Sequence, residues 1–242
     1  MSRNAGVGTA LAEAPVELDL ELVPEVPFGA SSDVILLDPL RPSETGSEEF
    51  RTLRTRLEQL QSAHAIRTVL VTSASPGDGK SFTAANLALA EAQLADNPTL
   101  LCDFDLRKPI LHNLFRIGRS PGITDYLLGK ADLHDALRRI GNSNLFVMPA
   151  GEAVANPLGL LHSKEVRRLM DRLQNAFRRI LLDSPPLLVA SDANLLAALA
   201  DGTLLVTRIG STTMDSMGSA IGSLGHDNIL GVVANGIAAK RT

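Results

Sequence analysis

The sequence predicts an α/β protein with a mainly parallel central sheet and helices on both faces. Three observations lead to this class. Short apolar runs alternate along the chain with segments of helical periodicity. The runs are apolar at consecutive positions, which is typical of strands that are buried on both faces. A glycine-rich loop pattern lies between the first run and the helix that follows it. In a sheet of this kind, ligands bind at the carboxyl ends of the strands.

Residues 1–42 differ in composition from the rest of the chain. They are rich in proline and include an acidic segment, residues 17–25, without a clear helical period. We expect a flexible N-terminal extension or a loosely packed arm here, and one domain over residues 43–242. A role of the extension in docking to a partner is a second interpretation of the same residues.

The expected elements follow in order from residue 43. The first helix is expected at about residues 43–61, where the spacing of apolar residues is helical at Phe50, Leu53, Leu57 and Leu60. Six apolar runs are expected as strands: 69–71, 100–102, 145–148, 180–182, 204–206 and 230–233. Two later helices are expected around Val166, Leu169, Leu173 and Phe177, and around Met214, Met217, Ile221 and Leu224. The methionine-bearing stripe is expected to lie in the core.

Composition excludes several classes of protein. A net charge of −4 over 242 residues gives no field that favours nucleic acid as a partner. A single cysteine, Cys102, excludes an internal disulfide and is expected in the core. No signal peptide and no apolar stretch of the roughly 18 residues needed to span a bilayer is recognisable. We therefore expect a cytoplasmic protein without a membrane span. The five histidines lack metal-ligand spacing.

The glycine-rich loop is residues 74–81, A-S-P-G-D-G-K-S. It fits the phosphate-loop pattern GxxxxGK[ST] with Ala74 in place of the first glycine. Glycines let successive N–H groups point at phosphate oxygens, the lysine reaches the β- and γ-phosphates, and the serine hydroxyl binds Mg²⁺. The alternative is a chance glycine-rich turn. The expected nucleotide contacts are Pro76, Gly77, Asp78, Gly79, Lys80, Ser81 and Phe82.

Three aspartates close apolar runs and are expected at the same edge of the sheet. Asp103 and Asp105 lie in L-L-C-D-F-D-L-R-K-P, and Asp183 lies in I-L-L-D-S-P-P. Carboxylates there can order Mg²⁺ and its waters, or accept the proton of an attacking hydroxyl group or water. The alternative for the first two is a pair that caps the following turn.

Together these three segments resemble the Walker A, Walker A′ and Walker B motifs of the bacterial tyrosine kinases of capsule and exopolysaccharide biosynthesis. The similarity extends over about residues 36–237 and includes P-G-I-T-D-Y-L-L-G-K, M-P-A-G, N-P-L-G-L-L and A-D-G-T-L-L-V-T-R. It implies a P-loop architecture of the MinD/ParA type and an ATP- and Mg²⁺-dependent protein-tyrosine kinase. It also implies roles: Lys80, Asp103 and Asp105 as catalytic residues, and Ser81, Asp103 and Asp183 at the metal. Asn235 is implied near the adenine base, and a strand-end turn is the alternative for it.

The resemblance also implies partners. Glu48, Arg51 and Arg54 match the pattern ExxRxxR, through which family members assemble into a ring. The alternative for these residues is a solvated helix face with an internal Glu48–Arg51 pair. Family members without membrane spans depend on a membrane-bound polysaccharide co-polymerase as activator. This implies a location at the inner face of the plasma membrane through that partner.

The phosphate acceptor is where this chain departs from the family. Members that autophosphorylate end in a tyrosine-rich tail, whereas this sequence has one tyrosine, Tyr126, in a segment expected to be structural. The protein either phosphorylates another polypeptide, or hydrolyses ATP as a MinD/ParA-like switch or assembly factor, or has a tail beyond this sequence. The signature lysine of such switches is absent from Ser73, Ala74 and Ser75, which counts against a pure switch. A catalytically silent scaffold is a third possibility.

Overall fold

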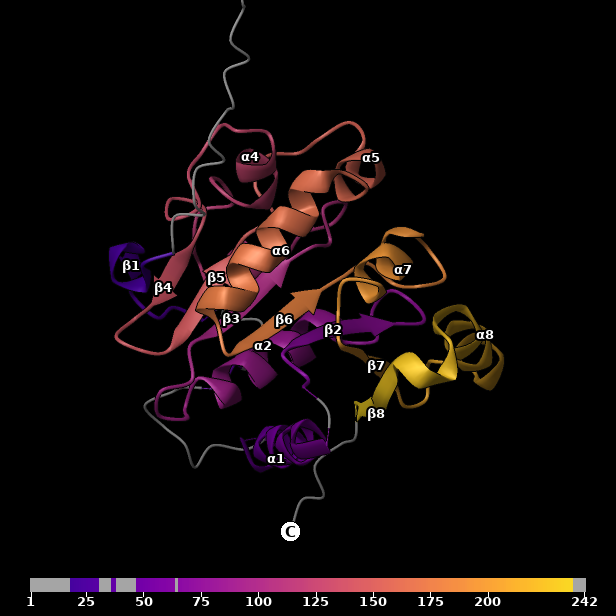
Figure 1. Ribbon diagram of the computed structural model, residues 1–242. Helices are drawn as coiled ribbons and strands as arrows, with labels where there is room; N and C mark the ends of the chain where they lie inside the picture. The colour runs from indigo at the N-terminus through magenta and orange to yellow at the C-terminus, as the bar shows by residue number, and fades with distance from the viewer. Residues whose placement is uncertain (1–17, 31–35, 38–46, 64, 237–242) are drawn as a thin grey trace, which may run out of the picture.

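A computed structural model describes residues 18–30, 36–37, 47–63 and 65–236. Its strands are β1 (Glu25–Val26), β2 (Thr68–Ser73), β3 (Thr99–Asp103), β4 (Arg138–Ile140), β5 (Leu145–Met148), β6 (Arg179–Asp183), β7 (Gly202–Arg208) and β8 (Ile229–Asn235). They form one sheet in the order β1-β4-β5-β3-β6-β2-β7-β8 (Figure 1). Neighbouring strands are parallel except β4 and β5, which are antiparallel. The predicted α/β class with a mainly parallel sheet is confirmed.

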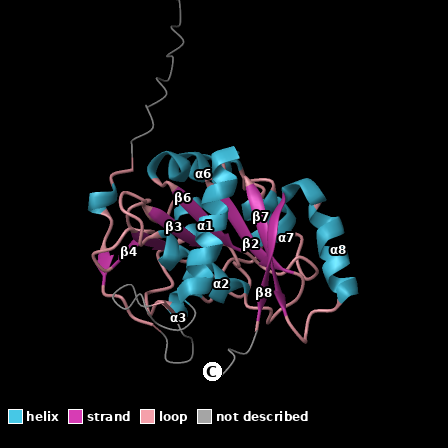
Figure 2. Cartoon of the chain, turned by 90° about the horizontal axis from the view of Figure 1, so that it is seen from below, coloured by secondary structure: helices cyan, strands magenta, loops and turns pink. Residues whose placement is uncertain are grey.

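Helices cover both faces of this sheet. They are α1 (Ser47–Ala63), α2 (Lys80–Glu91), α3 (Leu111–Leu114), α4 (Ile123–Leu127), α5 (Pro157–Leu161), α6 (Lys164–Ala176), α7 (Asp192–Ala197) and α8 (Met214–Leu224), with short 3₁₀ turns at Leu20–Leu22 and His226–Asn228. Helices α6 and α7 cover one face, and α2 covers the other with α1 packed against it (Figures 1 and 2). Residues 43–46 of the first expected helix lie outside the described residues.

Five of the six apolar runs, those in β2, β3, β5, β6 and β7, are buried on both faces of the sheet, whereas the run in β8, at the end of the sheet, is only partly buried. In β2, Leu70 belongs to the core under α6, while Val69 and Val71 belong to the core under α2. In β3, Cys102 faces the α6 side and Leu101 the α2 side. Alternation between two apolar layers leaves no polar position in the strand, so the sequence is continuously apolar.

Strands β1 and β4 were not predicted. The segment that forms β4 carries Arg138 and Arg139, and β1 has only two residues, so neither presents an apolar run. Within the predicted N-terminal extension, residues 18–30 lie against the sheet: Val26 pairs with Ile140, and Val23 is buried in the core on the α6 side. β1 is the edge strand and β4 lies next to it, away from the buried centre of the sheet, where polar residues are tolerated.

The expectation that the methionine-bearing stripe of α8 lies in the core is wrong for Met214. Leu224 is buried and Met217 and Ile221 pack partly against a small core cluster, but Met214 is 85% exposed. Met214 is the first residue of α8 and follows the turn that leaves β7, so it lies beyond the part of the helix that packs. Among the described residues, no helix is long and apolar enough to cross a membrane.

Candidate active site

The phosphate-loop segment joins the carboxyl end of β2 to the start of α2, as the motif requires. Gly77 and Gly79 both adopt positive φ angles, +86° and +96°, which glycine accepts without strain. A Cβ atom on Gly79 would lie 1.8 Å from Nδ2 of Asn235, so this glycine is also required for space. Lys80 is the first residue of α2, and the free N–H groups of this first turn face the loop.

The side chain of Asp78 holds the loop in shape. Its Oδ2 atom accepts a hydrogen bond from the backbone N–H of Ser75 at 3.0 Å, and its Oδ1 atom accepts one from the hydroxyl group of Thr212 at 2.8 Å. Asp78 is buried although its neighbours Pro76 and Gly77 are exposed. Asp78, which was predicted to contact the nucleotide, therefore also has a structural role. It closes the phosphate loop by contacting Ser75 and links the loop to the segment after β7.

Two more residues hold the loop from β7 and β8. Arg208 donates from its guanidinium to the carbonyl oxygen of Gly77 at 3.2 Å, and Asn235 donates from Nδ2 to the carbonyl oxygen of Asp78 at 3.0 Å. Arg208 was missed by sequence reasoning because nothing in the local sequence around it indicates a contact with a loop 131 positions away. Asn235, expected near the adenine base, lies beside the phosphate loop at the end of β8.

Lys80 and the three aspartates lie together at the carboxyl edge of the sheet. Asp103 and Asp183 are paired in register across β3 and β6. The ammonium group of Lys80 lies 3.1 Å from Oδ2 of Asp105 and 4.0 Å from Oδ1 of Asp183, and it also donates to the hydroxyl oxygen of Ser81 at 3.2 Å. Strand order thus brings together four charged residues that are up to 103 positions apart in the sequence.

The electrostatics of this cluster are dominated by burial. Burial raises the pKa of Asp103 to about 8, assisted by the charge of Asp183 and opposed by hydrogen bonds from the N–H groups of Leu111 and Ile110. Burial also raises the pKa of Asp183 to about 6, although Lys80 opposes the shift. Burial lowers the pKa of Lys80, but the charges of the aspartates outweigh burial and raise it above its usual value. The cluster therefore binds protons or cations strongly.

The residues fit a magnesium ion. Oδ1 of Asp103 is buried without a hydrogen-bond partner among the described residues, and the buried oxygens of Asp183 have only weak contacts, with Lys80 4.0 Å from Oδ1. Unpartnered buried carboxylate oxygens are costly unless a cation reaches them. The described residues contain no ready-made cluster of three or more His, Cys, Asp or Glu ligands. Mg²⁺ binds one or two protein carboxylates and keeps waters and phosphate oxygens as its other ligands, so Asp103 and Asp183 suffice as its carboxylates.

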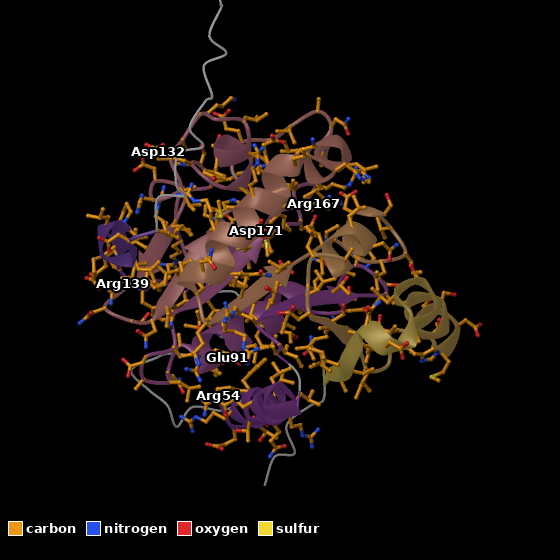
Figure 3. The ribbon with its side chains drawn as sticks, viewed as in Figure 1. Arg54, Glu91, Asp132, Arg139, Arg167 and Asp171 are labelled. Atoms are coloured by element: carbon orange, nitrogen blue, oxygen red, sulfur yellow. The ribbon has the colours of Figure 1, made fainter. Side chains whose placement is uncertain are left out.

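The remaining predicted site residues lie around α1 and α2. The ring of Phe82 packs edge-on against Phe50 of α1, with ring centroids 5.8 Å apart. Glu48 and Arg51 form the internal pair of the alternative interpretation, at 2.5 Å. Arg54 donates to the carbonyl oxygen of Ala90 at 2.7 Å and so binds the C-terminal end of α2, near Glu91 (Figure 3). Arg54 thus has a contact within its own chain.

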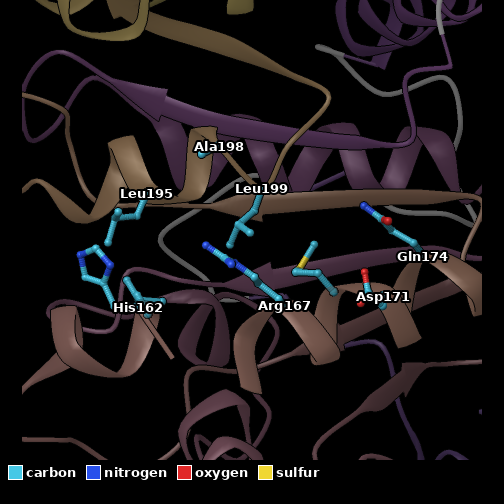
Figure 4. A pocket seen from close by; sticks show the side chains of 9 residues that line it. His162, Arg167, Asp171, Gln174, Leu195, Ala198 and Leu199 are labelled. Carbon is cyan, nitrogen blue, oxygen red and sulfur yellow. The ribbon is translucent and has the colours of Figure 1, made fainter. Parts of the chain in front are cut away.

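Cys102 and Tyr126, which the sequence suggested as structural residues, both lie inside the fold. Cys102 is fully buried in β3, and burial raises the pKa of its thiol. The hydroxyl oxygen of Tyr126 accepts a hydrogen bond from Arg172 of α6 at 3.1 Å. A groove of about 500 Å³ lies between α6 and α7, lined by residues that include His162, Arg167 and Leu199 (Figure 4). None of the predicted site residues lines it.

The parallel sheet, phosphate loop and strand-end aspartates define a P-loop nucleotide-binding protein. The fold is similar to the cell division ATPase MinD of Pyrococcus furiosus, with a TM-score of 0.57, 22% identity and 69% coverage of each chain. At this identity the similarity establishes the fold alone. No protein-family model matches the chain.

Closer similarity defines the family. Over 197 residues the chain is 36% identical to the tyrosine-protein kinase YwqD of Bacillus subtilis (strain 168), covering 81% of this chain and 83% of YwqD. It is also similar to the kinase domain of the Escherichia coli tyrosine kinase ETK, with a TM-score of 0.79 and 29% identity, over 86% of this chain and 83% of that one. The chain therefore belongs to the bacterial tyrosine kinase family of capsule and exopolysaccharide biosynthesis, as its motifs predicted.

Proposed function

We propose that this protein transfers the γ-phosphoryl group of ATP to tyrosine hydroxyl groups in exopolysaccharide or capsule biosynthesis. The observation that carries the proposal is the contact of Lys80 with Asp105 beside the register-paired Asp103 and Asp183, since it joins a phosphate-binding lysine to three strand-end carboxylates. Family membership supports the same reaction. The matched relative YwqD is named as a tyrosine-protein kinase.

The phosphate loop would hold the triphosphate. Backbone N–H groups at Gly77–Ser81 and the start of α2 supply donors for the phosphate oxygens. The ammonium group of Lys80 lies 3.1 Å from Asp105 in this structure. With a nucleotide bound, it would leave this carboxylate, contact phosphate oxygens and neutralise the negative charge that develops during transfer. Asp103, Asp183 and the Ser81 hydroxyl would hold Mg²⁺, which when bound neutralises charge on the phosphates.

Transfer then requires a group that receives the proton. With Asp103 and Asp183 occupied at the metal, Asp105 is the remaining carboxylate, and its Oδ2 is freed when Lys80 turns to the phosphates. The tyrosine oxygen forms a bond to the γ-phosphorus while the bond to the β–γ bridging oxygen breaks. ADP leaves with the electron pair, and the phenol proton passes to Asp105. Asn235 is proposed near the adenine base.

The acceptor is proposed to lie on another polypeptide. The one tyrosine of this sequence, Tyr126, is engaged with Arg172 inside the fold. The proposed setting is the cytoplasmic face of the plasma membrane, with a membrane-bound polysaccharide co-polymerase as activator.

The test measures phosphotyrosine formed from Mg·ATP on a glutamate–tyrosine copolymer and on candidate partner proteins, with and without the cytoplasmic segment of the co-polymerase. We expect transfer by the wild-type chain, at least about 100-fold loss in Asp105→Asn and Lys80→Met, and no loss in Asp171→Asn, an exposed residue of α6. Hydrolysis of ATP without phosphotyrosine on any component would favour the MinD/ParA-like switch. Absence of Mg·ATP binding by calorimetry would favour a silent scaffold.

We also propose that the chain assembles into a ring through Glu48, Arg51 and Arg54, and a single substitution at Arg51 tests this better than a change of both arginines. Arg54 binds the end of α2 within its own chain, so changing it disturbs the fold as well as any interface. Arg51 contacts Glu48 on the same exposed part of α1, and its side chain is 26% exposed. We expect Arg51→Glu to lower the mass measured by light scattering while leaving the melting temperature within about 2 °C, since surface substitutions cost little. An unchanged mass of an oligomer would contradict the ring proposal.

A further inference from the structure

The loop that carries Asp105, residues 104–110 between β3 and α3, is tied down at its ends. Oδ2 of Asp103 accepts hydrogen bonds from the N–H groups of Ile110 and Leu111, both at 3.0 Å. The N–H of Phe104 donates to the carbonyl oxygen of Asp183 at 2.8 Å. These bonds close the base of the loop. They do not hold the middle of the loop against the rest of the site.

In addition to the contact of Asp105 with Lys80, a second ion pair holds the middle of the loop. Arg107 donates from Nε to one carboxylate oxygen of Asp192 at 2.8 Å and from a terminal nitrogen to the other at 3.1 Å. Two parallel bonds from a planar guanidinium fix orientation as well as distance. Asp192 begins α7 and its side chain is only 1% exposed, whereas that of Arg107 is 45% exposed. The buried carboxylate therefore depends on this arginine for compensation of its charge.

The segment that leads into α7 is in turn anchored to the last residue of β2 and the first residue of the phosphate loop. The N–H of Leu187 donates to the carbonyl oxygen of Ser73 at 2.9 Å, and the N–H of Leu188 donates to that of Ala74 at 3.3 Å. Leu187 and Ala193 share a small buried cluster with Ala74. Displacement of Asp192 relative to the phosphate loop is thus resisted by both backbone bonds and packing.

We infer that Arg107 and Asp192 form a positioning pair, which holds Asp105 at the phosphates by joining its loop to the segment anchored on the phosphate loop. The inference rests on the proposed transfer reaction. Neither residue touches the substrate in this role. They act through Asp105, which lies two positions before Arg107. Oδ1 of Asp105 accepts a hydrogen bond from the N–H of Lys108 at 3.0 Å. A misplacement of about 1 Å in such a group lowers the rate by as much as about 100-fold.

The kinetic test compares Arg107→Gln, Asp192→Asn, the double variant and Arg107→Lys. We expect kcat to fall about 10- to 100-fold in each of the first two, with the KM for ATP within about twofold because the phosphate loop is intact. If the pair acts as a unit, the double variant is no worse than the poorer single variant. Arg107→Lys keeps the charge and recovers part of the rate. The matched control is Lys130→Gln, which breaks an exposed pair with Glu152.

Hydrogen exchange with Mg·ADP bound gives a readout that does not depend on transfer. We expect faster exchange at the amides of residues 105–108, 110 and 111 in Arg107→Gln and Asp192→Asn alike. The amides of residues 77–81 and the Lys130→Gln control should be unchanged. Unchanged exchange at residues 105–108, 110 and 111, additive kinetic losses, or a rise in KM without a fall in kcat would overturn the inference. If the wild-type chain transfers no phosphate, the exchange rates still test whether the pair holds the loop, separately from the proposed transfer reaction. If Arg107→Gln and Asp192→Asn do not fold, the test uses the exchange rates and kcat of Arg107→Lys. Wild-type values in both would overturn the inference that Arg107 and Asp192 position Asp105.

Discussion

Replacing Asp103 by asparagine is expected to stabilise the protein without metal or nucleotide while abolishing its activity. The side chain is fully buried, and its pKa is raised from 3.8 to about 8 by burial and by Asp183. Between these two pH values the folded state binds more protons than the unfolded state. The free energy of unfolding therefore falls as the pH rises from about 4 to about 8.

The size of the destabilisation by Asp103 follows from the pH range between its unfolded and folded pKa values. Between pH 5 and pH 8 the carboxyl group lowers the free energy of unfolding by up to about 4 kcal/mol, at about 1.4 kcal/mol per pH unit. Entry of water and local rearrangement reduce this to about 2 kcal/mol. Asparagine can still accept the hydrogen bonds from Ile110 and Leu111, and it carries no charge.

The assay is thermal unfolding of the wild-type chain and Asp103→Asn in EDTA at pH 5 and pH 8. A gain of about 2 kcal/mol corresponds to a melting temperature about 4–8 °C higher for the variant at pH 8. The difference should be markedly smaller at pH 5, where only about one pH unit of the window that begins at 3.8 contributes, and Asp171→Asn on the exposed face of α6 should show neither effect. A variant that is no more stable at pH 8, or equally more stable at both pH values, would refute the reasoning about the buried carboxylate.

Two further predictions concern the loop and the core. Gly79→Ala places a Cβ atom 1.8 Å from Asn235 at a φ of +96°, so we expect a loss of stability of about 1–3 kcal/mol and loss of Mg·ATP binding by calorimetry. Gly218→Ala, in open space within α8, is the matched control and should be neutral or stabilising. Glu91→Gln leaves the buried guanidinium of Arg179 without its carboxylate, 3.1 Å away. It should cost about 3–5 kcal/mol in urea unfolding, and a cost below about 1 kcal/mol would contradict this account.

Predictability differed between strands with a continuous apolar run and strands without one. Strands β2, β3, β5, β6 and β7 were predicted because burial between two layers of helices makes a run continuously apolar. Strand β8 is only partly buried at the end of the sheet, but its residues 230–233 are still mostly apolar. Strand β4, which carries Arg138 and Arg139 and lies between the edge strand β1 and β5, has no continuous apolar run that would have predicted it. Met214 shows the opposite error: its helical spacing is that of a buried stripe, yet α8 packs only farther along its length.

By itself the sequence determined the fold class, the phosphate loop at Gly77–Ser81, and Asp103, Asp105 and Asp183 as strand-end acids. Such features are local, because each follows from the residue types within one strand, loop or helix. Only the tertiary structure decided that Lys80 contacts Asp105, and that Arg107 holds Asp192 from 85 positions away. Contacts of this kind depend on strand order and on the packing of loops at the sheet edge, and neither leaves a pattern in the neighbouring sequence.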